Sequence, residues 1–181
     1  MTNANPPSDY RILVPRDWFR VDLTQERWRH QLKTFVDMEF AGSGAPADIA
    51  RSIWLTLRNA AESGFSQGGL ELFLKTESPG GTALPASLLV SLALTPRGLT
   101  PAPADFAETL IRRTGGDGEV DVIEVQAGRT VRVVKDTTLD FHVHMPGDVG
   151  YLHLAFSIPL SGTKGPLGDL CDAIVHSLRW A

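Results

Sequence analysis

The chain has almost no cysteine. Cys171 is its one cysteine in 181 residues, so neither an intrachain disulfide nor a cysteine-based zinc site can form within one chain. Its apolar neighbours favour a small core residue over a nucleophile. A chain of this length buries roughly 70% of its unfolded surface, so its core needs neither a disulfide nor a metal ion to be stable.

Long hydrophobic runs are also missing. No stretch reaches the roughly 18 apolar residues of a membrane span, and the longest run, Leu84 to Leu94, is interrupted by Pro85, Ser87 and Ser91. The first ten residues lack the charged start and apolar core of a secretory signal. We therefore expect a cytoplasmic protein without a membrane span, with a flexible tail over residues 1–9.

Positive charge is not in excess. The 17 basic and 21 acidic residues give a net charge of -4, which argues against nucleic-acid binding, because such binding needs a positive field to release counterions. Five arginines nevertheless crowd the first thirty residues and form a candidate interaction surface: Arg11, Arg16, Arg20, Arg27 and Arg29. The alternative is a solvated face on which nearby Asp and Glu residues balance this charge.

The common cofactor motifs are absent as well. Neither the dinucleotide pattern GxGxxG nor the P-loop pattern GxxxxGK[ST] occurs, and the Gly-Gly pairs at 68–69, 80–81 and 115–116 are typical of turns. We therefore expect no bound cofactor and assign no catalytic residue. The missing motifs favour an interaction protein over an enzyme.

Hydrophobic periodicity indicates the order of elements. Two short strands, Ile12 to Val14 and Phe19 to Leu23, are expected to form a tight hairpin around Trp18. Helices are expected from an N-cap at Thr24 to about Phe40, and from Pro46 to Gly64. The remaining expected elements are strands over 70–75 and 84–94 with a turn at 78–81, a helix from Pro103, strands over 120–125, 130–134, 139–145 and 151–158, and a closing helix with the apolar stripe Leu167, Leu170, Cys171, Ile174, Val175 and Leu178.

This order predicts a single α+β domain over residues 10–181. Hairpin-type links between successive strands imply a mostly antiparallel sheet, and the amphipathic helices must pack on its faces to bury their apolar stripes. The expected architecture is an α/β/α sandwich.

Both ends of the chain carry a family resemblance. The expected hairpin with Trp18 precedes the antiparallel strands, and the end reads Ala155-Phe156-Ser157-Ile158-Pro159 and then Ile174 to Trp180. In this architecture the chain resembles the PsbP-like α/β/α sandwich superfamily, which includes an extrinsic photosystem subunit, a Ran-binding Mog family and many uncharacterised bacterial proteins. The resemblance implies a noncatalytic interaction or ligand-binding module and transfers no functional residue.

A group of histidines is the most specific chemical pattern. Asp140, His142 and His144 alternate along one expected strand and therefore share a face. The next strand would place His153 opposite His142, and Tyr151 opposite His144. Imidazoles with a carboxylate are ligands that zinc and nonhaem iron prefer, so His142, His144 and His153 are candidate metal ligands. The alternative is the polar face of an amphipathic hairpin, and a register slip of one residue would move His153 to the other face.

Three classes of function remain open. The preferred one is a noncatalytic protein-interaction or accessory (adaptor) domain of a bacterial assembly, such as a secretion apparatus, whose partner is another protein. The second is a small-molecule binding module of helix-grip type, with a curved sheet wrapped around the last helix. The third is a metal-dependent enzyme that uses the histidine hairpin. A homo-oligomer is compatible with each of them.

Overall fold

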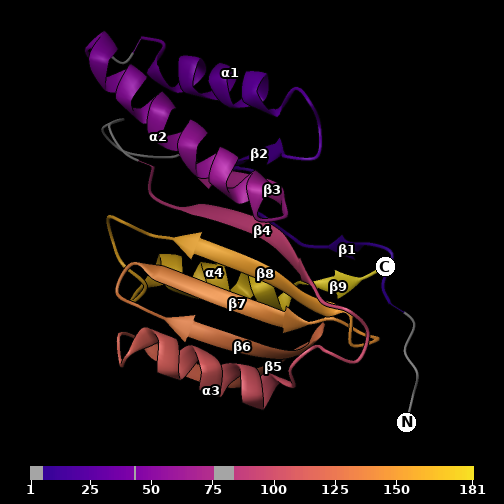
Figure 1. Ribbon diagram of the computed structural model, residues 1–181. Coiled ribbons are helices and arrows are strands. Elements are labelled where there is room, and N and C mark those ends of the chain that lie inside the picture. Colours follow the sequence, from indigo (N-terminus) through magenta and orange to yellow (C-terminus); the bar gives the residue numbers. More distant parts are fainter. Residues whose placement is uncertain (1–5, 43, 76–83) are drawn as a thin grey trace.

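The computed structural model describes residues 6–42, 44–75 and 84–181 (Figure 1). In chain order the elements are β1 (Tyr10–Arg11), β2 (Trp18–Asp22), α1 (Trp28–Phe40), α2 (Ala47–Ser66), β3 (Gly69–Lys75), β4 (Ser87–Leu94), α3 (Pro103–Thr114), β5 (Glu119–Val125), β6 (Gly128–Val134), β7 (Thr138–His144), β8 (Gly150–Ser157), α4 (Pro166–His176) and β9 (Arg179–Trp180).

A seven-stranded sheet organises the chain, with the strand order β2-β3-β4-β8-β7-β6-β5. Every pair of neighbouring strands is antiparallel. This confirms the α+β class that the sequence predicts, with helices packed on an antiparallel sheet. Strand β4 lies between β3 and β8, in the central position expected for a strand that is apolar on both sides.

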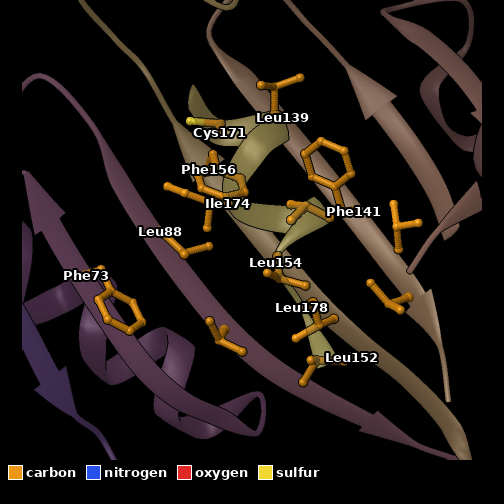
Figure 2. Close-up of a cluster of buried hydrophobic side chains, with 14 of the residues drawn as sticks. Phe73, Leu88, Leu139, Phe141, Leu152, Leu154, Phe156, Cys171, Ile174 and Leu178 are labelled. Atoms are coloured by element: carbon orange, nitrogen blue, oxygen red, sulfur yellow. The ribbon is translucent and has the colours of Figure 1, made fainter. Parts of the chain in front are cut away.

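One face of the sheet packs against α4 (Figure 2). Phe141, Leu154 and Phe156 come from the middle of the sheet and are at most 2% exposed, and they cluster with Ile174 and Leu178 at the C-terminal end. Burying a side chain of this size stabilises the fold by roughly 1.5–3 kcal/mol. The apolar stripe predicted for the closing helix therefore forms one side of the main core.

The opposite face carries the other three helices. Leu72 and Leu74 of β3 cluster with Leu32 of α1 and Ala61 of α2, whereas Phe73 between them belongs to the α4 cluster. Side chains of this one strand alternate between the two faces of the sheet and therefore pack in both hydrophobic cores. At the far edge of the sheet, α3 packs on β5 and β6. In Figure 1, α2 lies above β8 and β7 and α3 lies below them, both on the same face of the sheet, and α4 lies behind these strands.

The predicted N-terminal hairpin is wrong. Strand β2 pairs with β3, and the preceding strand is β1, which pairs with β9 at the other end of the chain. Between them, Leu13 is 75% exposed and donates its backbone N–H to Ser177 Oγ at 2.9 Å. Ser8 and Asp9, which the sequence assigns to the tail, donate their N–H groups to the carbonyl of Ala181.

Two helix boundaries also differ from the expectation. Thr24 does not cap a helix, because its hydroxyl and its N–H both donate to Asp22 Oδ1, at 2.6 and 3.0 Å, in a local turn that competes with helix formation. The helix α1 therefore begins only at Trp28. The last helix ends at His176, and the residues after it form β9. The turn expected at 78–81 lies outside the described residues. None of the helices in the described ranges combines the length and the apolar character needed to cross a membrane.

Candidate functional site

The predicted histidine register is confirmed. His142 of β7 lies opposite His153 of β8, and His144 lies opposite Tyr151. The rings of His142 and His153 stack, with 4.2 Å between their centroids and 10° between their planes. This register follows from the alternation of polar and apolar residues on both strands, since a slip of one residue would expose Phe141 and Leu154.

The histidines are held by separate carboxylates. His153 Nε2 lies 2.8 Å from Asp140 Oδ1, and His144 Nε2 lies 3.3 Å from Asp148 Oδ1. Stacked imidazoles turn their faces to each other, whereas metal ligands must direct their nitrogen lone pairs at one point. In the part of the chain that the structure describes, no three His, Cys, Asp or Glu side chains are placed to hold a metal ion. The metal site stays a prediction that this geometry does not favour.

Helix α3 covers part of this histidine face. Phe106 meets His142 edge-on at 5.1 Å between ring centroids and contacts Tyr151 at 4.7 Å. Burial, and then the nearby charge of His153, lowers the pKa of His142 to about 3, and burial raises the pKa of Tyr151 to about 12. His142 and Tyr151 therefore form a neutral aromatic contact with α3, on the polar side of the amphipathic hairpin that was the sequence alternative.

The five N-terminal arginines come from β1, β2, α1 and the loops next to them. Arg20 forms an ion pair with Glu71, and Arg29 Nε lies 3.1 Å from Glu62 Oε1. The guanidinium of Arg29 also lies 4.5 Å from the ring centre of Trp28. At least these two arginines act within the fold. An interaction surface made of all five stays a prediction.

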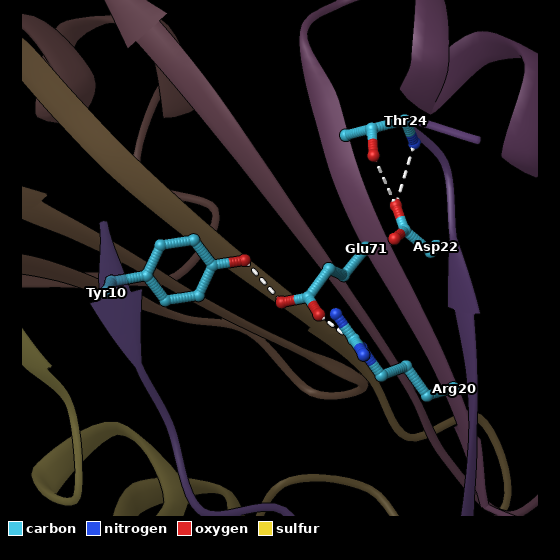
Figure 3. Close-up of polar contacts among 5 residues, drawn as sticks. All are labelled: Tyr10, Arg20, Asp22, Thr24 and Glu71. Carbon is cyan, nitrogen blue, oxygen red and sulfur yellow. Dashed lines mark hydrogen bonds and ion pairs between the residues drawn. The ribbon is translucent and has the colours of Figure 1, made fainter. Parts of the chain in front are cut away.

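A polar network ties the terminal strands to the sheet (Figure 3). The Tyr10 hydroxyl donates to one carboxylate oxygen of Glu71, and Arg20 Nε donates to the other. Burial and the hydrogen bond to Glu71 raise the pKa of Tyr10 well above its usual range. Sequence patterns do not reveal this network, because Tyr10 and Glu71 are far apart along the chain and each one resembles an ordinary strand residue.

An apolar groove of about 400 Å³ runs between α2 and the sheet. Its α2 wall is Ile53, Thr56, Leu57 and Ala60, and its opposite side includes Ala86, Ser87, Ser157 and Pro159. The apolar side of this helix, with Ile53, Leu57 and Ala60, is therefore only partly covered. Among the 20 residues of α2, Ala61 and Gly64 are buried, and a Cβ at Gly64 would lie 2.8 Å from Leu89 Cδ2.

One motif was missed at the sequence level. Gly64-Phe65-Ser66-Gln67-Gly68 fits the GxSxG spacing of the nucleophile elbow in many hydrolases. That elbow requires a turn from a strand into a helix, whereas Ser66 lies in the last turn of α2 and its hydroxyl donates to the Ser63 carbonyl at 2.8 Å. The motif lacks its structural context here, and Ser66 is not assigned a catalytic role.

Comparison with known proteins gives no relative: no family model matches the chain, and neither a curated protein nor a solved structure matches it. The class of the chain, an antiparallel sheet with helices packed on it, therefore rests on the structure itself.

Proposed function

We propose that the chain is a noncatalytic protein-interaction module, an adaptor that binds its partner through the apolar groove along α2. The observation that carries this proposal is the incomplete burial of α2. Its apolar residues Ile53 and Leu57 are half-buried and Ala60 is exposed, and all three line the groove. A helix of 20 residues is normally held by a fully covered apolar stripe.

The distribution of charge on α2 supports an interface at this groove. Residues on a helix are separated by about 100°, so the flank next to Ile53 and Ala60 also carries Ile49 and Thr56. This flank is uncharged. The charged residues Arg58 and Glu62 lie on the side toward α1, where Glu62 pairs with Arg58 and Arg29. Depletion of charge is typical of the core of a protein interface.

The helix-grip alternative is less well supported. A helix-grip module would hold its ligand between the sheet and the last helix, but here buried side chains of the α4 cluster occupy this space, including Leu88, Phe156 and Ile174 (Figure 2). The proposed PsbP-like resemblance is compatible with a noncatalytic module and adds no residue to the argument.

The proposal is tested by capture from a lysate of the source cell with three forms of the tagged chain. Ala60→Arg places a charged side chain over the groove from an exposed position, so the core is undisturbed. Asn59→Arg adds the same charge one residue away, outside the groove lining. We expect the wild type and Asn59→Arg to capture the same protein and Ala60→Arg to lose it.

Equal capture by the three forms would contradict the proposal. Native mass spectrometry of the purified chain tests the remaining alternative, in which the groove binds a small molecule and not a protein. A bound small molecule that Ala60→Arg displaces would assign the groove to a small ligand instead, since about 400 Å³ also suits small-molecule sites.

A further inference from the structure

The helices on the groove side of the sheet leave a strip between them. Helix α2 packs on β3 and α3 packs on β5 and β6, and Phe106 of α3 also covers His142 of β7 and Tyr151 of β8. The strip between the two helices (Figure 1) is therefore β4 together with the parts of β8 and β7 around Ala155 and Asp140.

Neighbouring strands are about 4.8 Å apart, which makes this strip roughly 10–15 Å wide. An α-helix with its side chains is about 10–12 Å across. The three strands thus span about the width of one helix, and next to α2 the strip is open as the groove of about 400 Å³ over Ser87 of β4 and Ser157 of β8.

The side chains on the floor of the strip are partly exposed. On this face β8 presents Ser157, Ala155 and His153, and each of them is half-buried. The short side chains of Ser157 and Ala155, with Ser87 of β4 opposite Ser157, leave room for the side chains of an incoming segment. Leu89 of β4, opposite Ala155, adds an apolar contact on the floor. Ile53 and Leu57 of α2 provide an apolar wall. The distance from Ser157 to His153 along β8 is about 13 Å, or somewhat more than two turns of a helix.

The backbone hydrogen-bonding groups of the strands that form the floor are already paired with neighbouring strands. Strand β4 pairs with β3 and β8, and β8 pairs with β4 and β7. These strands therefore offer no free N–H or C=O groups to an added strand, which is how extended peptides bind a sheet. A segment that lies on this floor must satisfy its own backbone hydrogen bonds, and an α-helix does so.

Charge adds a further constraint. Asp140 is the acidic residue on the floor, opposite Ala155 of β8. His153 occupies one of its oxygens at 2.8 Å, and the side chain is 28% exposed. The α2 wall beside it is uncharged. The strip is thus complementary to an apolar segment that carries one basic side chain.

We propose that the partner binds through a single amphipathic helix that lies along β8 between α2 and α3, with its apolar stripe on Ile53, Leu57 and Ala60 and a lysine or arginine at Asp140. This inference rests on the proposed function of the groove and specifies the chemistry of its occupant.

The test uses a phage library of random 16-residue peptides selected on the wild-type chain. We expect enriched sequences with apolar residues at helical spacing and a lysine or arginine on the same face. Circular dichroism should show that they gain helix on binding. Ala60→Arg should weaken binding at least about tenfold and Asp140→Asn about threefold. Asn59→Arg and Asp148→Asn are the matched controls and should leave the affinity within about twofold.

Two kinds of failure are distinguishable. Peptides that depend on Ala60 but bind without helix formation, or without any effect of Asp140→Asn, would overturn the helix inference and leave the interaction groove in place. A selection that enriches no peptide sensitive to Ala60→Arg would overturn both proposals.

Discussion

His142 is held in its neutral form by its surroundings on the sheet face that α3 covers. Phe106 from α3 meets its ring, His153 stacks on it from β8, and Asp140 lies on the same strand. Its pKa falls to about 3 in the folded chain, against 6.5 for an ordinary histidine. Below pH 6.5 the unfolded chain therefore binds a proton that the folded chain does not bind.

The free energy of unfolding should consequently fall as the pH is lowered from 6.5 to 3. Above pH 6.5 His142 is neutral in both the folded and the unfolded chain and causes no loss of stability. At pH 5 the loss from this residue is about 2 kcal/mol. Urea unfolding of the wild type and of His142→Phe at pH 7.5 and pH 5.0 checks this prediction. The wild type should lose about 2 kcal/mol more than the variant, whereas equal losses would show that folding does not lower the pKa of His142.

Tyr10 tests the network that joins the two chain ends to the sheet. Tyr10→Phe removes the hydroxyl that donates to Glu71 and should lower the free energy of unfolding by about 1.5 kcal/mol, because the acceptor is charged and only 12% exposed. Tyr151→Phe is the matched comparison. It loses a hydrogen bond to the neutral Pro101 carbonyl and should cost about 1 kcal/mol or less. A larger loss for Tyr151→Phe would contradict the ranking.

The elements differ in how firmly the fold holds them. Helix α4 buries Gly168, Cys171, Ile174 and Val175 among its 11 residues, whereas the longer α2 buries Ala61 and Gly64. Local opening is easier where few apolar groups are buried. We therefore expect the amides of α2 to exchange with deuterium faster than those of α4, measured by mass spectrometry on peptic fragments. Equal protection of the two helices would mean that α2 is held as firmly as the core.

The same contrast explains which elements the sequence predicts well. The register of the β7 and β8 hairpin is predictable, because Leu139, Phe141 and Val143 alternate with polar residues and fix which side faces the core. The stripe on α4 is predictable for the same reason. The start of α1 is not, because Thr24 has the right chemistry for an N-cap but bonds to Asp22 in a preceding turn.

At the scale of the whole molecule, pairing between distant segments is what the sequence conceals. Ile12 to Val14 and β2 look like a local hairpin, yet the first strand is β1, Tyr10–Arg11, and it pairs with Arg179 and Trp180. Local patterns carry no information on such a partner. The groove is hidden for a related reason. The stripe on α2 resembles an ordinary core-facing stripe, and only the arrangement of the other helices shows that part of it stays open.

The central claim is that this open groove is where the chain binds another protein. The most direct measurement is the affinity of the captured partner for the wild type, Ala60→Arg and Asn59→Arg, titrated in parallel by calorimetry. We predict that Ala60→Arg weakens binding at least about tenfold and that Asn59→Arg stays within about twofold of the wild type, because only the first buries an unpaired charge in the interface. Equal affinities for all three forms would place the binding surface elsewhere on the molecule.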